Sequence, residues 1–259
     1  MIWEIKALPL FVLDRYFQVL SSLSSLKSNL GKSNKEIINI LTLSKGRMKA
    51  EAEQVFKKSK LKITQESERS LIGYIKGYPN IRILYMNATE IIEALGKGIG
   101  DIGISGKDLW RESEQSIQSN IALAKEYSWG KSDLVVAVDN MWLDCVNPTD
   151  LEDISYEFYQ KKKRLMRCAT KFKNLAHGWF NSKGITQYEL ITSLGATEGA
   201  NKLGTADLIV DLSSTGETLR QNNLKVIDTI LSSSACLFYS KKSIKKKGVK
   251  KILKLLSKN

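Results

Sequence analysis

The segment that decides the fold is Ala-Asp-Leu-Ile-Val-Asp-Leu-Ser-Ser-Thr-Gly-Glu-Thr-Leu, at residues 206–219. Its first half contains the apolar residues Leu208, Ile209, Val210 and Leu212, which are typical of a buried strand. Its second half places four hydroxyl side chains and one glycine within residues 213–218. Hydroxyls, a glycine that lets backbone approach a ligand, and amide groups at the start of a helix together suit a phosphate. The segment therefore predicts a strand that ends in an anion-binding loop.

Two aspartates, Asp207 and Asp211, accompany this loop. Carboxylates accept hydrogen bonds from sugar hydroxyls and coordinate metal ions, so the pattern favours a phosphorylated sugar as the ligand. A second interpretation is purely structural, because serine and threonine are favoured at helix N-caps. One capping hydroxyl is enough to begin a helix, whereas this loop has four, which favours ligand binding.

The composition is that of an ordinary globular protein. The 259 residues are 42% hydrophobic and 26% charged, which allows one large domain or two modest ones. Three distant cysteines and a single histidine support neither a disulfide framework nor a zinc site. We therefore expect a reducing compartment and a cytoplasmic protein.

The first 36 residues stand apart from the rest of the chain. Residues 7–13 are apolar, but Asp14 and Arg15 end the run well short of the roughly 20 residues that a membrane helix needs. The same charged pair makes a poor secretory signal. Leucines at 20, 23, 26 and 30 have helical spacing. Residues 1–36 are predicted to be a helical N-terminal extension, with no contact to a membrane.

The net charge of +13 is concentrated near the C-terminus, where nine lysines lie between Lys241 and Lys258. Apolar residues alternate with them in the pattern of a basic amphipathic helix. Three interpretations stay open: a solvated helix whose apolar side packs on the body, a contact for acidic partners or nucleic acid, and attraction of polyanionic substrates. Because no nucleic-acid-binding motif accompanies the lysines, nucleic acid is the disfavoured partner.

From Ile37 onward, strands alternate with helices, which predicts an α/β protein with mostly parallel sheets. Residues 139–163 are charged and are predicted to be loop-like. Helices are expected after 44–47, after the capping-box pattern at 87–90, at 172–180, at 197–203 and in the lysine-rich end. Strands are expected at 37–43, 81–86, 101–104, 134–138, 165–169, 188–192, 208–212, 224–230 and 235–239.

Two segments match parts of known phosphate-binding motifs but lack the neighbouring residues or elements that those motifs require. Residues 98–103 match G-x-G-x-x-G, but they lead into a strand instead of following one. Gly106-Lys107 is followed by Asp108, where a P-loop needs serine or threonine to hold magnesium. Neither a dinucleotide-binding site nor a P-loop is predicted.

Taken together, the motifs resemble the ATP phosphoribosyltransferase family, which opens histidine biosynthesis. The resemblance extends over residues 37–239, and segment 207–219 is its most specific part. The matching segments are 43–48, 100–108, 134–138, 169–171 with 174–175, and 207–219. Many family members carry two arginines in the region of 85–90, where this chain has Asn87 and Thr89, so those contacts are not carried over.

The resemblance implies a two-lobed α/β fold similar to type II periplasmic binding proteins, with the active site in the cleft between the lobes. On this sequence, one lobe would be 37–137 plus 213–259, and the other 138–212 with the phosphate loop at its end. The chain ends before the extra regulatory domain of long family members. It therefore resembles the short form, which implies a homo-oligomer that assembles with a regulatory subunit similar to histidyl-tRNA synthetase.

The reaction implied is displacement at C1 of phosphoribosyl pyrophosphate (PRPP) by N1 of ATP, with Mg²⁺ bridging the pyrophosphate. Catalysis would come from positioning of the substrates and from electrostatic stabilisation, without a covalent catalytic residue. The residues expected to bind PRPP are Asp211, Ser213, Ser214, Thr215, Gly216, Glu217 and Thr218, with Asp207 as the second choice for the ribose. The residues expected to contact phosphates or ATP are Lys45, Gly46, Arg47, Lys107, Thr170, Lys171 and Glu198.

The main alternative is a non-catalytic, cytosolic small-molecule-binding or sensor protein of the same two-lobed fold, because that fold often binds ligands without chemistry. The hydroxyl-rich loop beside acidic residues favours the transferase.

Overall fold

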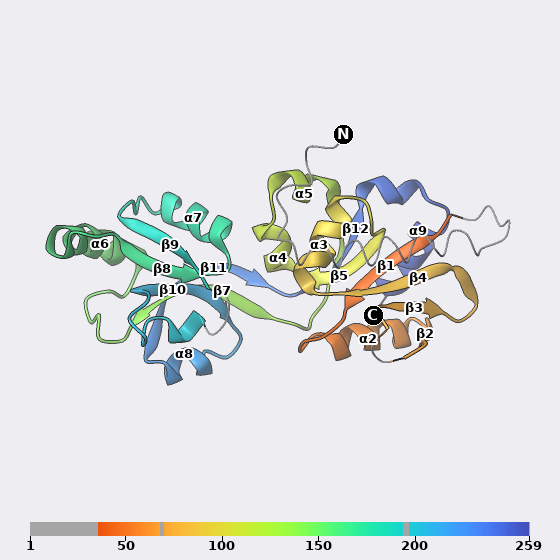
Figure 1. The fold of residues 1–259 in the computed structure, drawn as a ribbon, viewed down its shortest axis with the longest axis horizontal. Helices are drawn as coiled ribbons and strands as arrows, with labels where there is room; N and C mark the ends of the chain where they lie inside the picture. Colours follow the sequence, from red (N-terminus) through yellow and green to blue (C-terminus); the bar gives the residue numbers. More distant parts are fainter. Residues whose placement is uncertain (1–35, 68–69, 194–196, 259) are drawn as a thin grey trace. The chain divides into compact units, whose positions relative to one another are not determined.

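Two mixed β-sheets organise the chain (Figure 1). The computed structural model describes residues 36–67, 70–193 and 197–258. Residues 37–259 form one compact unit. The predicted helical extension at 1–36 lies outside the described residues.

The first sheet has β1 at its centre, parallel to its neighbours β4 and β5. The remaining pairs in this sheet are antiparallel. In order across the sheet, the strands are β2 (Ile63–Gln65), β3 (Ile72–Ile75), β4 (Tyr78–Met86), β1 (Ile38–Leu43), β5 (Ile102–Gly106), β12 (Ala235–Ser240) and β6 (Ile121–Glu126).

The helices that accompany the first sheet begin and pack much as their sequences predict. The side chain and backbone of Asn87 form a capping box with Glu90 at the start of α3. In α2, the apolar positions Ala52, Val55 and Phe56 are buried, as their spacing predicts. The bounds are α2 (Lys49–Lys58), α3 (Ala88–Gly96), α4 (Lys107–Glu112), α5 (Gln115–Asn120), a 3-10 helix (Lys241–Lys245) and α9 (Val249–Leu256).

Helix α9 packs its apolar side into the core of the first sheet. Val249, Ile252, Leu253 and Leu256 are buried in that core. The lysines lie on the other side of the helix, where Lys250, Lys251 and Lys254 are exposed. This confirms the interpretation of a docked terminal helix with a solvated basic face.

The second sheet has β7 and β10 at its centre and two helices on opposite faces. Leu134, Val136 and Val138 of β7 share a core with Ala176 and Phe180 of α7. The alternate positions Val135 and Ala137 instead pack with Leu219 of α8. In order, the strands are β11 (Leu224–Ser233), β7 (Ser132–Asp139), β10 (Leu208–Ser213), β8 (Met166–Thr170) and β9 (Tyr188–Thr192). The helices are α6 (Pro148–Lys162), α7 (Lys173–Ser182), a 3-10 helix (Thr197–Gly199) and α8 (Glu217–Gln221).

The prediction of mostly parallel sheets is wrong. Among the described residues, parallel pairing is confined to β4-β1-β5 and β10-β8-β9. Strands β7 and β12 enter from the opposite sheet and pair antiparallel with their neighbours. The hairpins of β2, β3 and β4 add further antiparallel pairs. The alternation of strands and helices along the sequence does not reveal these antiparallel pairs, because it carries no information on strand direction.

The two sheets also divide the chain at other residues than the lobe boundaries expected at 137 and 213. Strand β7, at 132–139, and strand β11, at 224–233, both belong to the second sheet. The chain crosses between sheets after β6 and again at Ser234. Strand β7 pairs along one edge with β10 and along the other with β11, so both crossing segments lie outside the predicted limits.

Residues 139–163, predicted to be loop-like, contain the helix α6. Asn147 caps it by accepting hydrogen bonds from the backbone of Thr149 and Asp150, and Pro148 occupies the first turn. The predicted helix at 197–203 is reduced to a 3-10 turn. No helix in the described ranges is both long and apolar enough to cross a membrane. All three cysteines are buried and unpaired.

Candidate functional site

The serine- and threonine-rich loop after β10 lines a pocket of about 340 Å³. The second sheet supplies most of its wall, and Arg47, which follows β1 of the first sheet, completes it. All seven residues predicted to bind PRPP lie in this wall. The lining residues are Arg47, Ser132, Glu198 and the continuous stretch Asp211–Leu219.

The loop is a tight turn that uses some of its own hydroxyls. Ser213 Oγ accepts a hydrogen bond from the Gly216 N–H at 3.1 Å, and Thr215 Oγ1 accepts one from the Glu217 N–H at 3.4 Å. Gly216 has φ of +73°, a conformation that side chains with a Cβ rarely adopt. The hydroxyls of Ser213 and Thr215 therefore hold the turn together, and both also line the pocket. The N-cap interpretation is wrong, because the N-cap of α8 is Gly216 and no side chain caps that helix.

Arg47 and Ser214 meet across the pocket. Arg47 Nη1 donates a hydrogen bond to Ser214 Oγ at 3.1 Å, and both side chains are exposed to solvent. The chain reaches Arg47 from β1 through Gly46, whose φ of +93° turns the backbone just before it. A guanidinium beside a hydroxyl-rich turn is a combination that can bind a phosphate with several charge-assisted hydrogen bonds.

The acidic residues of the pocket differ in their partners. Asp211 Oδ1 accepts from the Leu212 N–H at 2.8 Å, and the Asp211 side chain is only partly exposed. Glu217 is paired within its own helix, where hydrogen bonds from Arg220 and Gln221 hold its pKa below the usual range. Asp211 and Glu198 are therefore the acidic groups of the wall best placed to contact a ligand.

Of the seven residues predicted to contact phosphates or ATP, the structure brings only some to the pocket. Arg47 and Glu198 line the pocket, whereas the other five are not among its lining residues. Lys107 Nζ pairs with Glu126 at 3.1 Å. Thr170 is buried, and its hydroxyl accepts from the Phe172 N–H at 2.9 Å. Lys45 and Lys171 are exposed.

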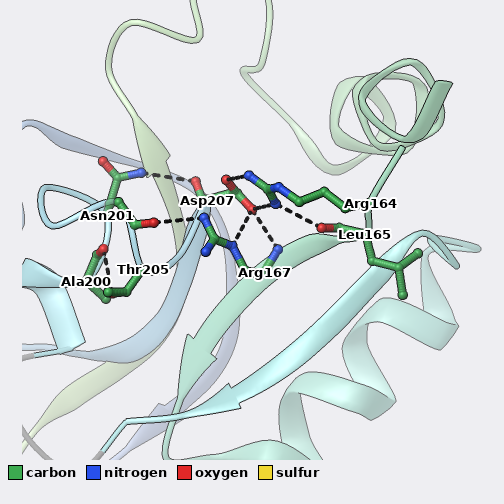
Figure 2. A network of polar contacts seen from close by, with 8 residues as sticks. Arg164, Leu165, Arg167, Ala200, Asn201, Thr205 and Asp207 are labelled. Atoms are coloured by element: carbon green, nitrogen blue, oxygen red, sulfur yellow. Dashed lines mark hydrogen bonds and ion pairs between the residues drawn. The ribbon is translucent and has the colours of Figure 1, made fainter. Parts of the chain in front are cut away.

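Asp207, the second choice for the ribose, has a structural role. It immediately precedes β10, whereas the loop lies at the opposite end of that strand. Arg164 donates to both of its carboxylate oxygens, at 2.7 and 2.9 Å, and the Arg167 N–H donates at 2.8 Å (Figure 2). Partial burial raises the pKa of Asp207, but these hydrogen bonds outweigh it and hold the pKa below its usual range. The carboxylate is thus committed to two arginines.

Sequence reasoning missed Ser132 and did not assign a role to Leu212. Ser132 begins β7, whose register places Asp133 opposite Ser213 of β10. That register brings the start of one strand beside the end of the other, so Ser132 reaches the pocket through strand pairing. Nothing in the local sequence around Ser132 signals it.

Comparison with known proteins gives a consistent result. The family model described as ATP phosphoribosyltransferase, HisG, matches residues 87–258. The chain is 40% identical over 209 residues to the ATP phosphoribosyltransferase of Rhizobium etli, covering 79% of this chain and 90% of the relative. It is 41% identical over 211 residues to the enzyme of that name from Mesorhizobium japonicum, covering 80% and 91%.

Solved structures share the fold. A chain of the ATP phosphoribosyl transferase (HisG:HisZ) complex from Thermotoga maritima matches with a TM-score of 0.69 at 24% identity, covering 86% of this chain and 98% of that one. An L-cystine ABC transporter protein from Listeria monocytogenes matches with a TM-score of 0.52 at 12% identity, covering 86% and 88%. The expected two-lobed fold, similar to type II periplasmic binding proteins, is confirmed.

Proposed function

The chain belongs to the ATP phosphoribosyltransferase family, and we propose that the pocket beside β10 is where it binds PRPP. Family membership makes the chain a pentosyltransferase of histidine biosynthesis, and it favours this function over a non-catalytic sensor. The observation that carries the proposal is that the loop 213–218 and Arg47 line one pocket and meet at 3.1 Å.

The reaction joins N1 of the adenine of ATP to C1 of the ribose. The C1–O bond to pyrophosphate breaks, and the bonding electrons leave with the pyrophosphate. A transition state with oxocarbenium character needs an anchored sugar, an aligned nucleophile and a neutralised leaving group. The chain can meet these needs by binding and orientation, without a covalent intermediate.

We assign the parts of PRPP to the pocket by their chemistry. The 5′-phosphate would lie in the turn at 213–218, because amide and hydroxyl groups there can surround it and Gly216 leaves room for close approach. Asp211 would accept hydrogen bonds from the ribose hydroxyls. Arg47 would offer its guanidinium to a phosphate group, with two N–H donors side by side.

The acidic groups also fit a divalent cation, which we propose is Mg²⁺. No cluster of three or more candidate metal ligands occurs in the part of the chain that the structure describes. Magnesium in phosphate-transfer sites commonly binds one or two carboxylates together with substrate phosphates, and Asp211 and Glu198 could supply these. The ion would neutralise charge on the departing pyrophosphate.

We further propose that the enzyme works with a regulatory subunit similar to histidyl-tRNA synthetase. The Thermotoga maritima chain with the same fold comes from a HisG:HisZ complex, and this chain covers 98% of it. A homo-oligomeric catalytic core is part of the same proposal.

The test is direct assay of the purified chain with PRPP, ATP and Mg²⁺, alone and with the regulatory subunit. We expect phosphoribosyl-ATP and pyrophosphate in equal amounts in at least the second condition. Replacing Mg²⁺ with a chelator should abolish product. A folded protein that forms no product in either condition would contradict the proposal.

A further inference from the structure

Helix α4 connects the two sheets beside the chain crossing. At its first residue, the Lys107 N–H donates to the backbone carbonyl of Ser234, in the crossing segment between β11 and β12, at 3.0 Å. Leu109 packs against the hydrophobic cores of both sheets, and Trp110 stacks at a tilt on Phe238 of the first sheet. The end of the helix, at Glu112, reaches α7 of the second sheet.

Glu112 supplies the N-terminal cap that α7 lacks. Residue Phe172, in the N-cap position of α7, has no side chain that can accept a capping hydrogen bond. Glu112 instead accepts from the Asn174 N–H at 2.9 Å and from the Leu175 N–H at 3.0 Å. Asn174 Nδ2 donates back to the Glu112 carbonyl at 2.7 Å. Three hydrogen bonds therefore join helices that belong to different sheets.

This contact lies on the opposite face of the second sheet from the pocket. Helix α7 packs on the face that contains Leu134 and Val136. Leu219 packs on the other face and lines the pocket. Within the described ranges the chain crosses between sheets twice, and two crossing segments side by side form a natural hinge. Contacts on both faces join the two sheets, among them Glu112 to α7 on one face and Arg47 to Ser214 on the other, and together they resist rocking in both directions.

We propose that Glu112 and Asn174 are positioning residues, which hold the second sheet at the angle where Arg47 meets the phosphate loop. The proposal rests on the proposed function of that pocket. Without the Glu112 contact, the two sheets sample other angles, and the fraction of molecules with Arg47 on the loop falls. The apparent affinity for PRPP falls by the same fraction, whereas bound PRPP selects the competent angle again.

The experiment measures PRPP binding by calorimetry with Mg²⁺, and transferase kinetics of the same variants with the regulatory subunit present. Glu112→Ala should raise the Kd and KM for PRPP by about five- to tenfold, and kcat should stay within about twofold. Glu112→Gln keeps one acceptor oxygen and should lie between Glu112→Ala and the unmodified protein. Glu114→Ala, an exposed neighbour whose side chain contacts Ser116, is the matched control and should change neither constant.

A double-mutant cycle separates positioning from simple structural support. If Glu112 acts through Arg47, then Glu112→Ala should raise the PRPP Kd by less than about twofold in an Arg47→Ala background. The same fold-change in both backgrounds, or a loss of kcat with unchanged KM, would overturn the proposal. If the unmodified protein does not bind PRPP either alone or with the regulatory subunit, the proposed function fails. If it binds PRPP and Glu112→Ala binds equally well, only the positioning role fails.

Discussion

Single hydroxyl groups in the loop after β10 serve different purposes. Ser213 and Thr215 accept backbone N–H groups of the turn itself, whereas Ser214 accepts from Arg47 of the other sheet. The abundance of hydroxyls was readable from the sequence, and it predicted both a cap and a binding loop. The sequence could not show which hydroxyls accept from backbone N–H groups of the turn and which one meets Arg47. That choice depends on backbone torsions and on a residue 167 positions away.

Gly216 offers the sharpest residue-level test of the loop. Gly216→Ala forces a Cβ into a left-handed conformation, which costs about 1 kcal/mol, and should distort the turn that would hold the phosphate. We expect the KM for PRPP to rise at least about fivefold, with the KM for ATP changing much less. Gly178→Ala is the matched control: this exposed glycine lies within α7 with free space around it, so alanine should leave both KM values unchanged and stabilise the helix slightly. Equal losses for the two substrates in Gly216→Ala would contradict the loop assignment.

Asp207, in the same motif, allows a test of the structural ion-pair role that we assign to it. Its pKa is lower in the folded protein than in the unfolded chain, so its contribution to stability is complete above the unfolded value and disappears as pH falls through the folded value. Asp207→Asn should destabilise the protein at pH 7 by about 1–2 kcal/mol, toward the low end because Arg164 is 40% exposed.

Thermal unfolding of both proteins between pH 7 and pH 3 checks this account. The stability difference should be constant down to about pH 5 and shrink below about pH 4. Asp153→Asn, at an exposed position of α6, is the control and should follow the unmodified protein throughout. A difference that persists unchanged to pH 3 would contradict the ion-pair role, as would a PRPP affinity lost along with stability.

Two helices show what the sequence pattern does and does not predict at the scale of elements. The lysine-rich end was recognisable as amphipathic, because its apolar residues recur on one side, and α9 does pack that side into the core. Helix α6 was missed because its apolar residues are few and its charges dominate. Its start signal was nevertheless present in Asn147-Pro148-Thr149-Asp150, a cap followed by proline and an acid three residues on.

Helix α9 should therefore contribute to stability through one side only. Ile252 is 2% exposed, and Ile252→Ala should lower the free energy of unfolding by about 2–4 kcal/mol through lost burial and the cavity left behind. Lys250→Ala, on the exposed side of the same helix, should change it by less than about 0.5 kcal/mol. Chemical denaturation of the two variants measures both values. Similar losses in both would mean that the lysine side is also packed.

For the molecule as a whole, the sequence predicted the class of fold and singled out the loop that lines the pocket, but not the strand connections that assemble them. Motifs are local, so segment 207–219 could be recognised from its own residues. Strand direction and register are not local. They place β7 and β11 in the second sheet and pair Asp133 with Ser213, which brings the neighbouring Ser132 to the pocket. The cap that Glu112 provides to α7 is likewise invisible along the chain, since 62 residues separate the partners.

Hydrogen exchange measured by mass spectrometry, with and without PRPP and Mg²⁺, tests the central claim most directly. Peptides that cover residues 211–219 should exchange more slowly when PRPP is present, because the loop's amide groups then bind its phosphate. Peptides from α6, at 148–162, should be unaffected and serve as the internal control. Slower exchange elsewhere in a protein that binds PRPP, with residues 211–219 unchanged, would contradict the account.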